Sequence, residues 1–342
     1  MPTPRRAVAA ATALLLALAC AVGGAIPATA APPTTSAPSD EPQVFTGKAF
    51  DTCTAPALDA LRAWRRNSPY GALGIYIGGR NRGCAQPRLN TGWTRSATAM
   101  GWRLLPLYAG SQAPCLAGRS SARIDPRRAV AIGTAEGRDA VRSAAALNIA
   151  PGSPVYLDME SYDRDGGRCT LAVLQYTVAW TRAVHAAGYL SGFYSSADAG
   201  IADLAALAAG SEHRAVGGPA ALPDVIWYAR WDCRAGTDGY HALRRGVWAR
   251  HQRLHQYEGN TTERYGDVTL RIDRNAVDAP VAIVRPPGSE PSGGKGGGKG
   301  GAKGGGKGGA KGGGKGGGKA VVPGRVAVGG VSGKARPGIH HR

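Results

Sequence analysis

The feature that most constrains the fold of this chain is a regular alternation of short apolar segments with amphipathic ones across residues 44–284. The apolar segments, five or six residues each, are rich in β-branched and aromatic residues, which is typical of strands. We expect eight strands, at residues 49–53, 73–78, 104–108, 155–160, 190–194, 225–229, 253–257 and 268–273. Apolar residues at helical spacing predict helices between them, at residues 57–66, 92–100, 127–147, 171–187 and 199–207.

Eight strands separated by helices within one stretch of this length predict an α/β fold, a (β/α)8 TIM barrel forming a single globular domain. A doubly wound sheet is the alternative, and it usually carries a glycine-rich phosphate turn after its first strand. Here that turn reads Asp51-Thr52-Cys53-Thr54, and Gly78-Gly79 lacks the rest of a dinucleotide motif. The barrel is therefore favoured.

In such a barrel the chemistry collects where the strands end, at the C-terminal face. The expected strand ends carry mainly acids, aromatic residues and amides: Asp51, Tyr76, Tyr108, Asp158, Glu160, Tyr194, Trp227, Arg230, Gln256, Asp273 and Asn275. Carboxylates and amides bind sugar hydroxyls, and aromatic rings stack on the C–H faces of sugars. The sequence has no Gly-x-Ser-x-Gly, P-loop or His-Glu-x-x-His motif. The set predicts a sugar site.

Asp158 and Glu160 are the most informative pair in this set. They follow the apolar run 154–157, and residues two apart on a strand point to the same face. Two adjacent carboxyl groups titrate differently, because each charge disfavours the other. Glycoside hydrolysis needs such a pair. The alternative is an ordinary solvated loop, since Asp-x-Glu is a common triplet.

The composition divides the chain into four zones. Residues 1–30 combine Arg5 and Arg6, an apolar run and a small-residue cleavage site at 28–30, which predicts a signal peptide for export by the general or the twin-arginine route. Residues 31–44 are a disordered lead rich in Pro, Thr and Ser, and residues 45–284 form the barrel. We expect a secreted protein, extracellular or associated with the cell wall.

The fourth zone, residues 285–342, is a cationic tail. Lysine recurs every fourth residue from Lys295 to Lys319 within almost pure glycine and alanine, and glycine makes a stable helix there too costly. The tail carries twelve Lys or Arg against one Glu, and so eleven of the nineteen net positive charges. We expect a flexible tether whose partners are anionic wall polymers or lipid head groups, with no specific nucleic acid. The alternative is a passive linker.

Removal of the signal peptide leaves five cysteines: Cys53, Cys84, Cys115, Cys169 and Cys233. In an exported protein this number predicts two disulfides and one free thiol. Cys84 and Cys115 follow the second and third strands, which are neighbours in a barrel, so we expect them to pair. Cys53 would then pair with Cys169 and leave Cys233 free, although the sequence alone does not settle this second pair.

Seven short motifs in this chain occur in the order typical of one family. They are FDTCTAP at 50–56, GIYIGG at 74–79, GWRLLPLY at 101–108, LDME at 157–160, GFYSS at 192–196, HQY at 255–257 and IDRN at 272–275. Over residues 46–281 the chain thus resembles the actinobacterial glycoside-hydrolase-like TIM-barrel domain catalogued as domain of unknown function 1906. That family is distantly similar to the Chalaropsis-type lysozymes, which cleave linkages between N-acetylmuramic acid and N-acetylglucosamine.

The resemblance implies roles for four acids. Glu160 would be the general acid, and Asp158 would orient and polarise the acetamido group of the substrate in a substrate-assisted reaction. Asp51 and Asp273 would stabilise positive charge on the sugar ring and hold it. Tyr76, Tyr108, Tyr194, Trp227, Arg230, Gln256 and Asn275 are expected to bind the substrate.

We therefore expect a monomeric, wall-associated glycoside hydrolase acting on peptidoglycan or a related amino-sugar glycan, with no cofactor and no metal. Two alternatives remain open, because a fold does not by itself imply turnover. The first is a carbohydrate-binding pseudoenzyme with the same pocket. The second is a surface-structural protein in which the tail alone matters.

Overall fold

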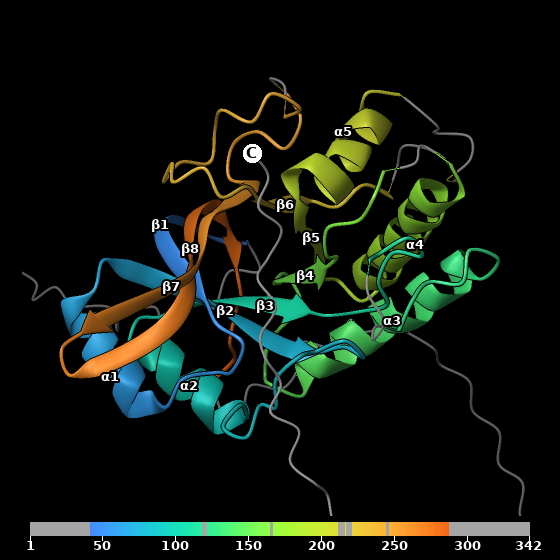
Figure 1. Ribbon diagram of the computed structural model, residues 1–342. Helices are drawn as coiled ribbons and strands as arrows, with labels where there is room; N and C mark the ends of the chain where they lie inside the picture. Colours follow the sequence, from blue (N-terminus) through green and yellow to red (C-terminus); the bar gives the residue numbers. More distant parts are fainter. Residues whose placement is uncertain are drawn as a thin grey trace, which may run out of the picture. The chain divides into compact units, whose positions relative to one another are not determined.

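Eight strands close into one barrel in the order β1 to β8 (Figure 1). The computed structural model describes residues 42–117, 122–164, 167–210, 216, 221–243 and 246–286. The strands are β1 (Gln43–Asp51), β2 (Tyr70–Gly78), β3 (Arg103–Tyr108), β4 (Pro154–Asp158), β5 (Leu190–Ser196), β6 (Val225–Ala229), β7 (Arg253–Tyr265) and β8 (Val268–Val281). All eight predicted strands exist, and the α/β barrel is confirmed.

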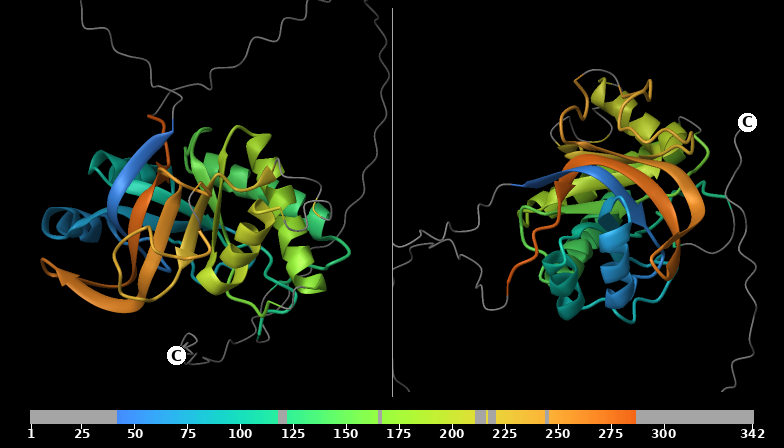
Figure 2. Two further views of the ribbon diagram at one scale, coloured as in Figure 1. Left: turned by 90° about the horizontal axis from the view of Figure 1, so that it is seen from above. Right: turned by 90° about the vertical axis from the view of Figure 1, so that its left-hand side faces the viewer.

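The first seven strands follow one another in parallel, but β8 runs antiparallel to both β7 and β1. The barrel therefore departs from a strict eightfold repeat. Only residues 266 and 267 separate β7 from β8, and so short a connection permits a hairpin but no crossover. The predicted strand 253–257 was too short, because β7 continues into a long hairpin beyond the barrel (Figure 2). The predicted strand 268–273 covers the hairpin end of β8 and missed residues 274–281, which pair with β1 in the barrel.

Helices follow each of the first five strands. They are α1 (Leu58–Asn67), α2 (Thr91–Ala99), α3 (Ala129–Ala145), α4 (Arg168–His185), and α5 (Ala202–Ala208), which is preceded by the π-helical turn η1 (Ala197–Ile201). Helices α3 and α4 lie side by side on the outside of the barrel (Figure 1). The hairpin reaches α1, where the indole of Trp64 donates to the carbonyl of Val268 at 3.0 Å. In the described residues no helix follows β6 or β7.

Two separate sets of apolar side chains make up the core, because residues alternate along each strand. One set packs between the strands and the helices. The other fills the barrel itself and includes Leu105, Leu107, Tyr156 and Trp227. Gly74 leaves the space that this inner set needs, since a Cβ there would lie 2.6 Å from the Cβ of Asp51 and 3.0 Å from the ring of Trp227.

The disulfides are Cys53–Cys84 and Cys115–Cys169, with Cys233 free and exposed. The prediction of two bridges and one free thiol is confirmed, but the pairing of Cys84 with Cys115 and that of Cys53 with Cys169 are wrong. The structure identifies Cys233, which the sequence left open, as the free thiol. Each bridge joins the segments that follow two successive strands, β1 with β2 and β3 with β4. Neighbouring strands allow either arrangement, and only the paths of the loops decide between them.

Among the described residues, no helix is both long and apolar enough to cross a membrane. The predicted signal peptide, the lead up to residue 41 and most of the cationic tail lie outside the described residues.

Candidate active site

Four acids predicted from the sequence meet at the C-terminal end of the parallel strands. Asp51 ends β1 and Asp158 ends β4, while Glu160 lies two residues beyond β4. Asp273 lies within β8, where it pairs in register with Asp51. The reversed direction of β8 explains why Asp273 comes early in a long strand instead of ending a short one. Asp51 and Asp158 are 4% and 3% exposed, Asp273 is half-buried, and Glu160 is exposed at the mouth of the barrel.

Two side-chain amides hold the carboxyl group of Asp51. Gln256 Nε2 and Asn275 Nδ2 both donate to its Oδ2, at 3.0 and 2.8 Å. The orientation of each amide is fixed from behind by an indole, which can only donate. Trp227 Nε1 donates to Asn275 Oδ1 at 2.7 Å, and Trp231 Nε1 donates to Gln256 Oε1 at 3.1 Å. Gln256 and Asn275 were predicted to bind substrate; the structure places them against Asp51.

The four carboxyl groups perturb one another. Burial, followed by the charge of Asp273, raises the pKa of Asp51 from 3.8 to about 8, although its two amide donors lower it. Burial and then the charge of Glu160 raise the pKa of Asp158 well above its usual value. Loss of hydration and the charge of Asp273 likewise raise the pKa of Glu160. Raised carboxyl pKa values are what acid catalysis near neutral pH requires.

Among the four acids, Asp158 has a carboxyl oxygen with no hydrogen-bond partner in the described residues. Its side chain accepts a hydrogen bond from Tyr76, yet Oδ1 is buried and has no partner within the described part of the chain. A buried carboxylate oxygen without a donor is costly. The position therefore suits a ligand that brings an N–H or O–H group.

Gln112 positions the two central acids and was missed by the sequence prediction. Its Nε2 donates to the carbonyl of Asp158 at 2.9 Å, and its Oε1 accepts from the amide of Glu160 at 2.7 Å. Both ends of this buried side chain thus fix the backbone between the acids. The signal available in the sequence was a polar residue soon after the third strand, where we had considered only Tyr108.

Asp273 is held by a bulge in β7 that the sequence prediction also missed. The register between β7 and β8 shifts between Glu258 and Thr261, and Asn260 adopts a positive φ of 58°. This conformation directs the amide of Asn260 to Asp273 Oδ1 at 2.5 Å. That hydrogen bond lowers the pKa of Asp273, but burial outweighs it and the pKa is raised overall.

The predicted substrate-binding aromatic residues fall into two groups. Tyr76 and Tyr194 are half-buried among the acids, and the Tyr194 hydroxyl donates to Gln256 Oε1 at 3.1 Å. Tyr108 is wrong as a substrate contact, because its hydroxyl donates to Asp139 on α3, on the outer side of the sheet. Trp227 is also wrong as a direct contact, since it is 0% exposed and fills the barrel beneath Asn275.

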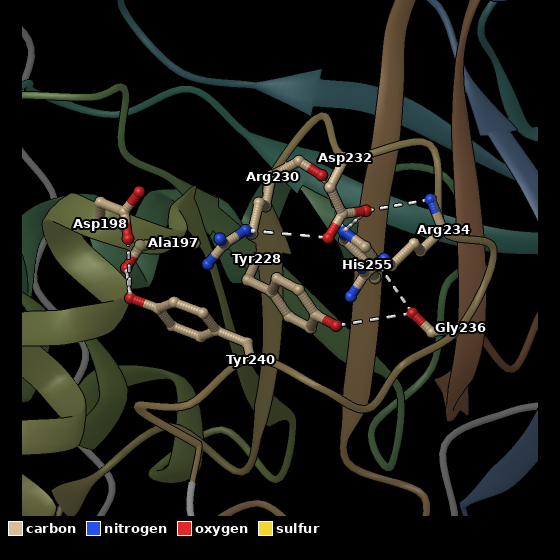
Figure 3. A network of polar contacts seen from close by, with 9 residues as sticks. All are labelled: Ala197, Asp198, Tyr228, Arg230, Asp232, Arg234, Gly236, Tyr240 and His255. Carbon is tan, nitrogen blue, oxygen red and sulfur yellow. Dashed lines mark hydrogen bonds and ion pairs between the residues drawn. The ribbon is translucent and has the colours of Figure 1, made fainter. Parts of the chain in front are cut away.

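Arg230 does not bind one of the four acids. It lies 3.8 Å from Asp232 and 5.5 Å from the ring of Tyr240, in the loop that follows β6 (Figure 3). As for metals, the described residues contain no group of three or more His, Cys, Asp or Glu arranged to hold an ion. The arrangement is that of an acid–base site whose carboxyl groups are held by amides.

Comparison with models of known protein families identifies one that matches this chain. The model of the Rv2525c-like, glycoside hydrolase-like domain matches residues 62–277, more than half of the 342-residue chain. No curated protein sequence matches the chain.

Several solved structures are similar to this chain at low identity and low TM-score. An uncharacterised B. stearothermophilus protein is 19% identical, with a TM-score of 0.42 over 68% of this chain and 95% of that one. A muramidase from Acremonium alcalophilum is 14% identical, with a TM-score of 0.38 over 68% and 93%. The catalytic domain of endolysin ply40 from bacteriophage P40 of Listeria monocytogenes is 12% identical, with a TM-score of 0.38 over 68% and 94%. Similarities this distant carry no argument about function.

Proposed function

Since the chain belongs to the Rv2525c-like, glycoside hydrolase-like domain family, we propose that it hydrolyses glycosidic bonds in an N-acetylated amino-sugar polymer, with peptidoglycan as the first candidate. The observation that carries the proposal is the buried, unpartnered Oδ1 of Asp158 beside Glu160. An N-acetyl group supplies a donor for this oxygen together with a carbonyl oxygen that can reach the reacting carbon, whereas the 2-hydroxyl of an ordinary hexose supplies the donor alone.

Glu160 acts as the general acid. It is the exposed member of the four acids, so it can reach a glycosidic oxygen at the mouth, and its raised pKa keeps it protonated further toward neutral pH. As the bond between the anomeric carbon and the glycosidic oxygen breaks, the proton of Glu160 passes to that oxygen. The leaving sugar then departs with a new hydroxyl group.

Asp158 acts through the substrate. Its free Oδ1 accepts the acetamido N–H, which turns the acetamido carbonyl oxygen toward the anomeric carbon. That oxygen forms a bond to the carbon as the leaving group departs, and the resulting positive charge is offset by Asp158. Water then attacks the anomeric carbon, the bond between this carbon and the acetamido oxygen breaks, and a proton of the water passes to the Glu160 carboxylate. Asp51 and Asp273 lie beside this path: Asp273 offsets charge on the sugar ring, while Asp51, whose pKa of about 8 leaves it largely protonated near neutral pH, holds the ring.

The disulfides support a proposal about where the protein is located. Two disulfides are typical of a protein that matures in an oxidising compartment. We propose export by the signal at residues 1–30 and retention at the anionic wall by the tail at residues 285–342, which would raise the local substrate concentration. Deleting residues 285–342 should abolish wall retention at low salt, and high salt should release the intact protein. Unchanged retention would exclude this role.

The test of the activity compares the mature protein with its Glu160→Gln variant on purified peptidoglycan, by measuring new reducing ends. Asp267→Asn is the matched control, because Asp267 is fully exposed at the tip of the hairpin. Release by the wild type and the control alone supports hydrolysis with Glu160 as the acid. Absence of release with retained glycan binding would instead make the protein a carbohydrate-binding pseudoenzyme.

A further inference from the structure

One tryptophan differs from all the others in its exposure. All seven tryptophans lie in the described residues, and six of them are between 0% and 6% exposed. Trp231 is 49% exposed. An exposed indole is informative, because a ring this large usually contributes to a core. Trp231 also lies at the site, since its Nε1 donates to the same Gln256 that holds Asp51.

The backbone on both sides of Trp231 is fastened to β7. The amide of Arg230 donates to the carbonyl of Gln256, and the amide of Cys233 donates to the carbonyl of Tyr257, both at 3.0 Å. The exposed ring is thus presented by a fixed segment between two backbone anchors.

The side chain of His255 contacts the backbone of the same loop at residues 230 and 236. Its Nε2 lies 2.8 Å from the carbonyl of Arg230 and its Nδ1 lies 2.6 Å from the carbonyl of Gly236 (Figure 3). The imidazole stacks on Tyr228, with ring centroids 4.3 Å apart, and is only 2% exposed. A buried side chain therefore spans the loop from residue 230 to residue 236.

The indole of Trp231 packs against Gly259. A Cβ at this position would lie 1.9 Å from Cζ2 of Trp231, so the ring rests directly against the backbone of β7. Any side chain there would displace the ring. The contacts around Trp231 therefore hold the indole in one position at the edge of the site and leave about half of it exposed to solvent.

We propose that Trp231 is the stacking platform for a pyranose ring in the subsite next to the acids, and that this ring is an N-acetylhexosamine of the glycan. The apolar C–H face of the sugar covers the exposed part of the indole, while its polar edge meets Tyr194, which is half-buried among the acids. The inference rests on the proposed function and adds the residue that sets glycan affinity.

The test measures binding of N,N′,N″-triacetylchitotriose and of peptidoglycan sacculi to the mature full chain, with Glu160→Gln in every sample to prevent turnover. Trp231→Ala should weaken binding about tenfold, whereas Trp231→Phe, which keeps a ring, should lose about threefold. Gly259→Ala should weaken binding by displacing the ring without removing it. Val130→Ala is the control, because Val130 is 54% exposed on α3.

Fluorescence supplies a second readout. Since Trp231 is the one exposed indole among the seven, iodide should quench mainly its emission, and the sugar should protect it. Thermal unfolding of each variant separates lost binding from lost folding. In the active background, Trp231→Ala should raise KM about tenfold and change kcat less, because stacking acts on bound substrate and transition state alike.

The outcomes separate the two proposals. Unchanged binding by a folded Trp231→Ala variant would overturn the stacking role and leave the proposed hydrolysis intact. Weakened binding without turnover in the wild type would support the stacking role and overturn the hydrolysis. If the Glu160→Gln protein with Trp231 intact binds neither probe and the wild type releases no reducing ends, both proposals fail.

Discussion

The two sides of the barrel mouth are held by different means. On the side of β1 to β4, the segments that follow the strands are joined covalently, by Cys53–Cys84 and Cys115–Cys169. On the side of β6 to β8, the loop carrying Trp231 is held by hydrogen bonds to β7 and by His255, without a disulfide. The acids come from both sides, with Asp158 and Glu160 beside β4 and Asp273 in β8.

The two sides of the mouth have different proposed roles, one in bond cleavage and the other in sugar binding. The covalently fastened side carries the proposed proton donor and the group that orients the substrate, whose positions tolerate little movement. The hydrogen-bonded side carries the proposed stacking residue. We infer that damage to one side leaves the other side folded, and four predictions test this.

The largest effect is expected from Glu160→Gln. Loss of the proton donor should lower the rate of glycan cleavage about 10³-fold. Asp273→Asn, on the other side of the mouth, should cost about 10²-fold, because it removes charge stabilisation but no proton transfer. Reducing-end assays on peptidoglycan measure both. A larger loss for Asp273→Asn than for Glu160→Gln would reverse the assignment of roles.

Removal of the Cys115–Cys169 bridge tests the covalent side. The double change Cys115→Ser and Cys169→Ser opens a loop of 54 residues. It should lower the free energy of unfolding by about 4 kcal/mol. Urea denaturation gives this value, and iodide quenching of Trp231 should be unchanged in the folded variant. Increased quenching would show that the two sides are coupled.

Asp51→Asn should change how stability depends on pH. In the folded protein the pKa of Asp51 is raised from 3.8 to about 8, so the folded state binds the proton more tightly than the unfolded chain. The wild type therefore loses stability as the pH rises through this window, and it is most stable below it. The variant cannot ionise, so its stability relative to the wild type should increase by about 4 kcal/mol between pH 5 and pH 8.

Urea denaturation at pH 5 and pH 8 measures this difference, with the exposed Asp267→Asn as control. Parallel stability curves for wild type and Asp51→Asn would mean that Asp51 ionises as easily in the folded protein as in the unfolded chain.

The smallest effect is expected from His255→Phe. The ring keeps its stacking on Tyr228, but the carbonyls of Arg230 and Gly236 lose their contacts with the two ring nitrogens. This should lower the free energy of unfolding by about 2 kcal/mol and increase iodide quenching of Trp231. Hydrogen exchange should rise in residues 230–236 and stay unchanged near Cys115. Uniform destabilisation without a change in quenching would argue against His255 as the anchor of the loop.

Much of the candidate site could be predicted from the sequence. All four acids lie directly at or near the ends of apolar runs, and a run that ends in Asp or Glu is visible without a structure. Gln112, Asn260 and Trp231 were missed because each lies in a loop or bulge where no periodic pattern exists. Tyr108 was assigned wrongly because a strand pattern separates the two faces of a strand but does not tell which face meets the site. Trp227 faces the barrel interior but lies beneath Asn275, and the depth of a side chain within the barrel is not visible in the sequence.

The sequence by itself determined the barrel, its eight strands and the four acids, because periodicity and strand ends are local properties of the chain. Only the tertiary structure decided the direction of β8, the pairing of the cysteines and the hydrogen bonds that hold Asp51. A strand has the same pattern in either direction, and five cysteines allow many pairings. These choices depend on which loops meet in space, and that is settled by the packing of the whole barrel.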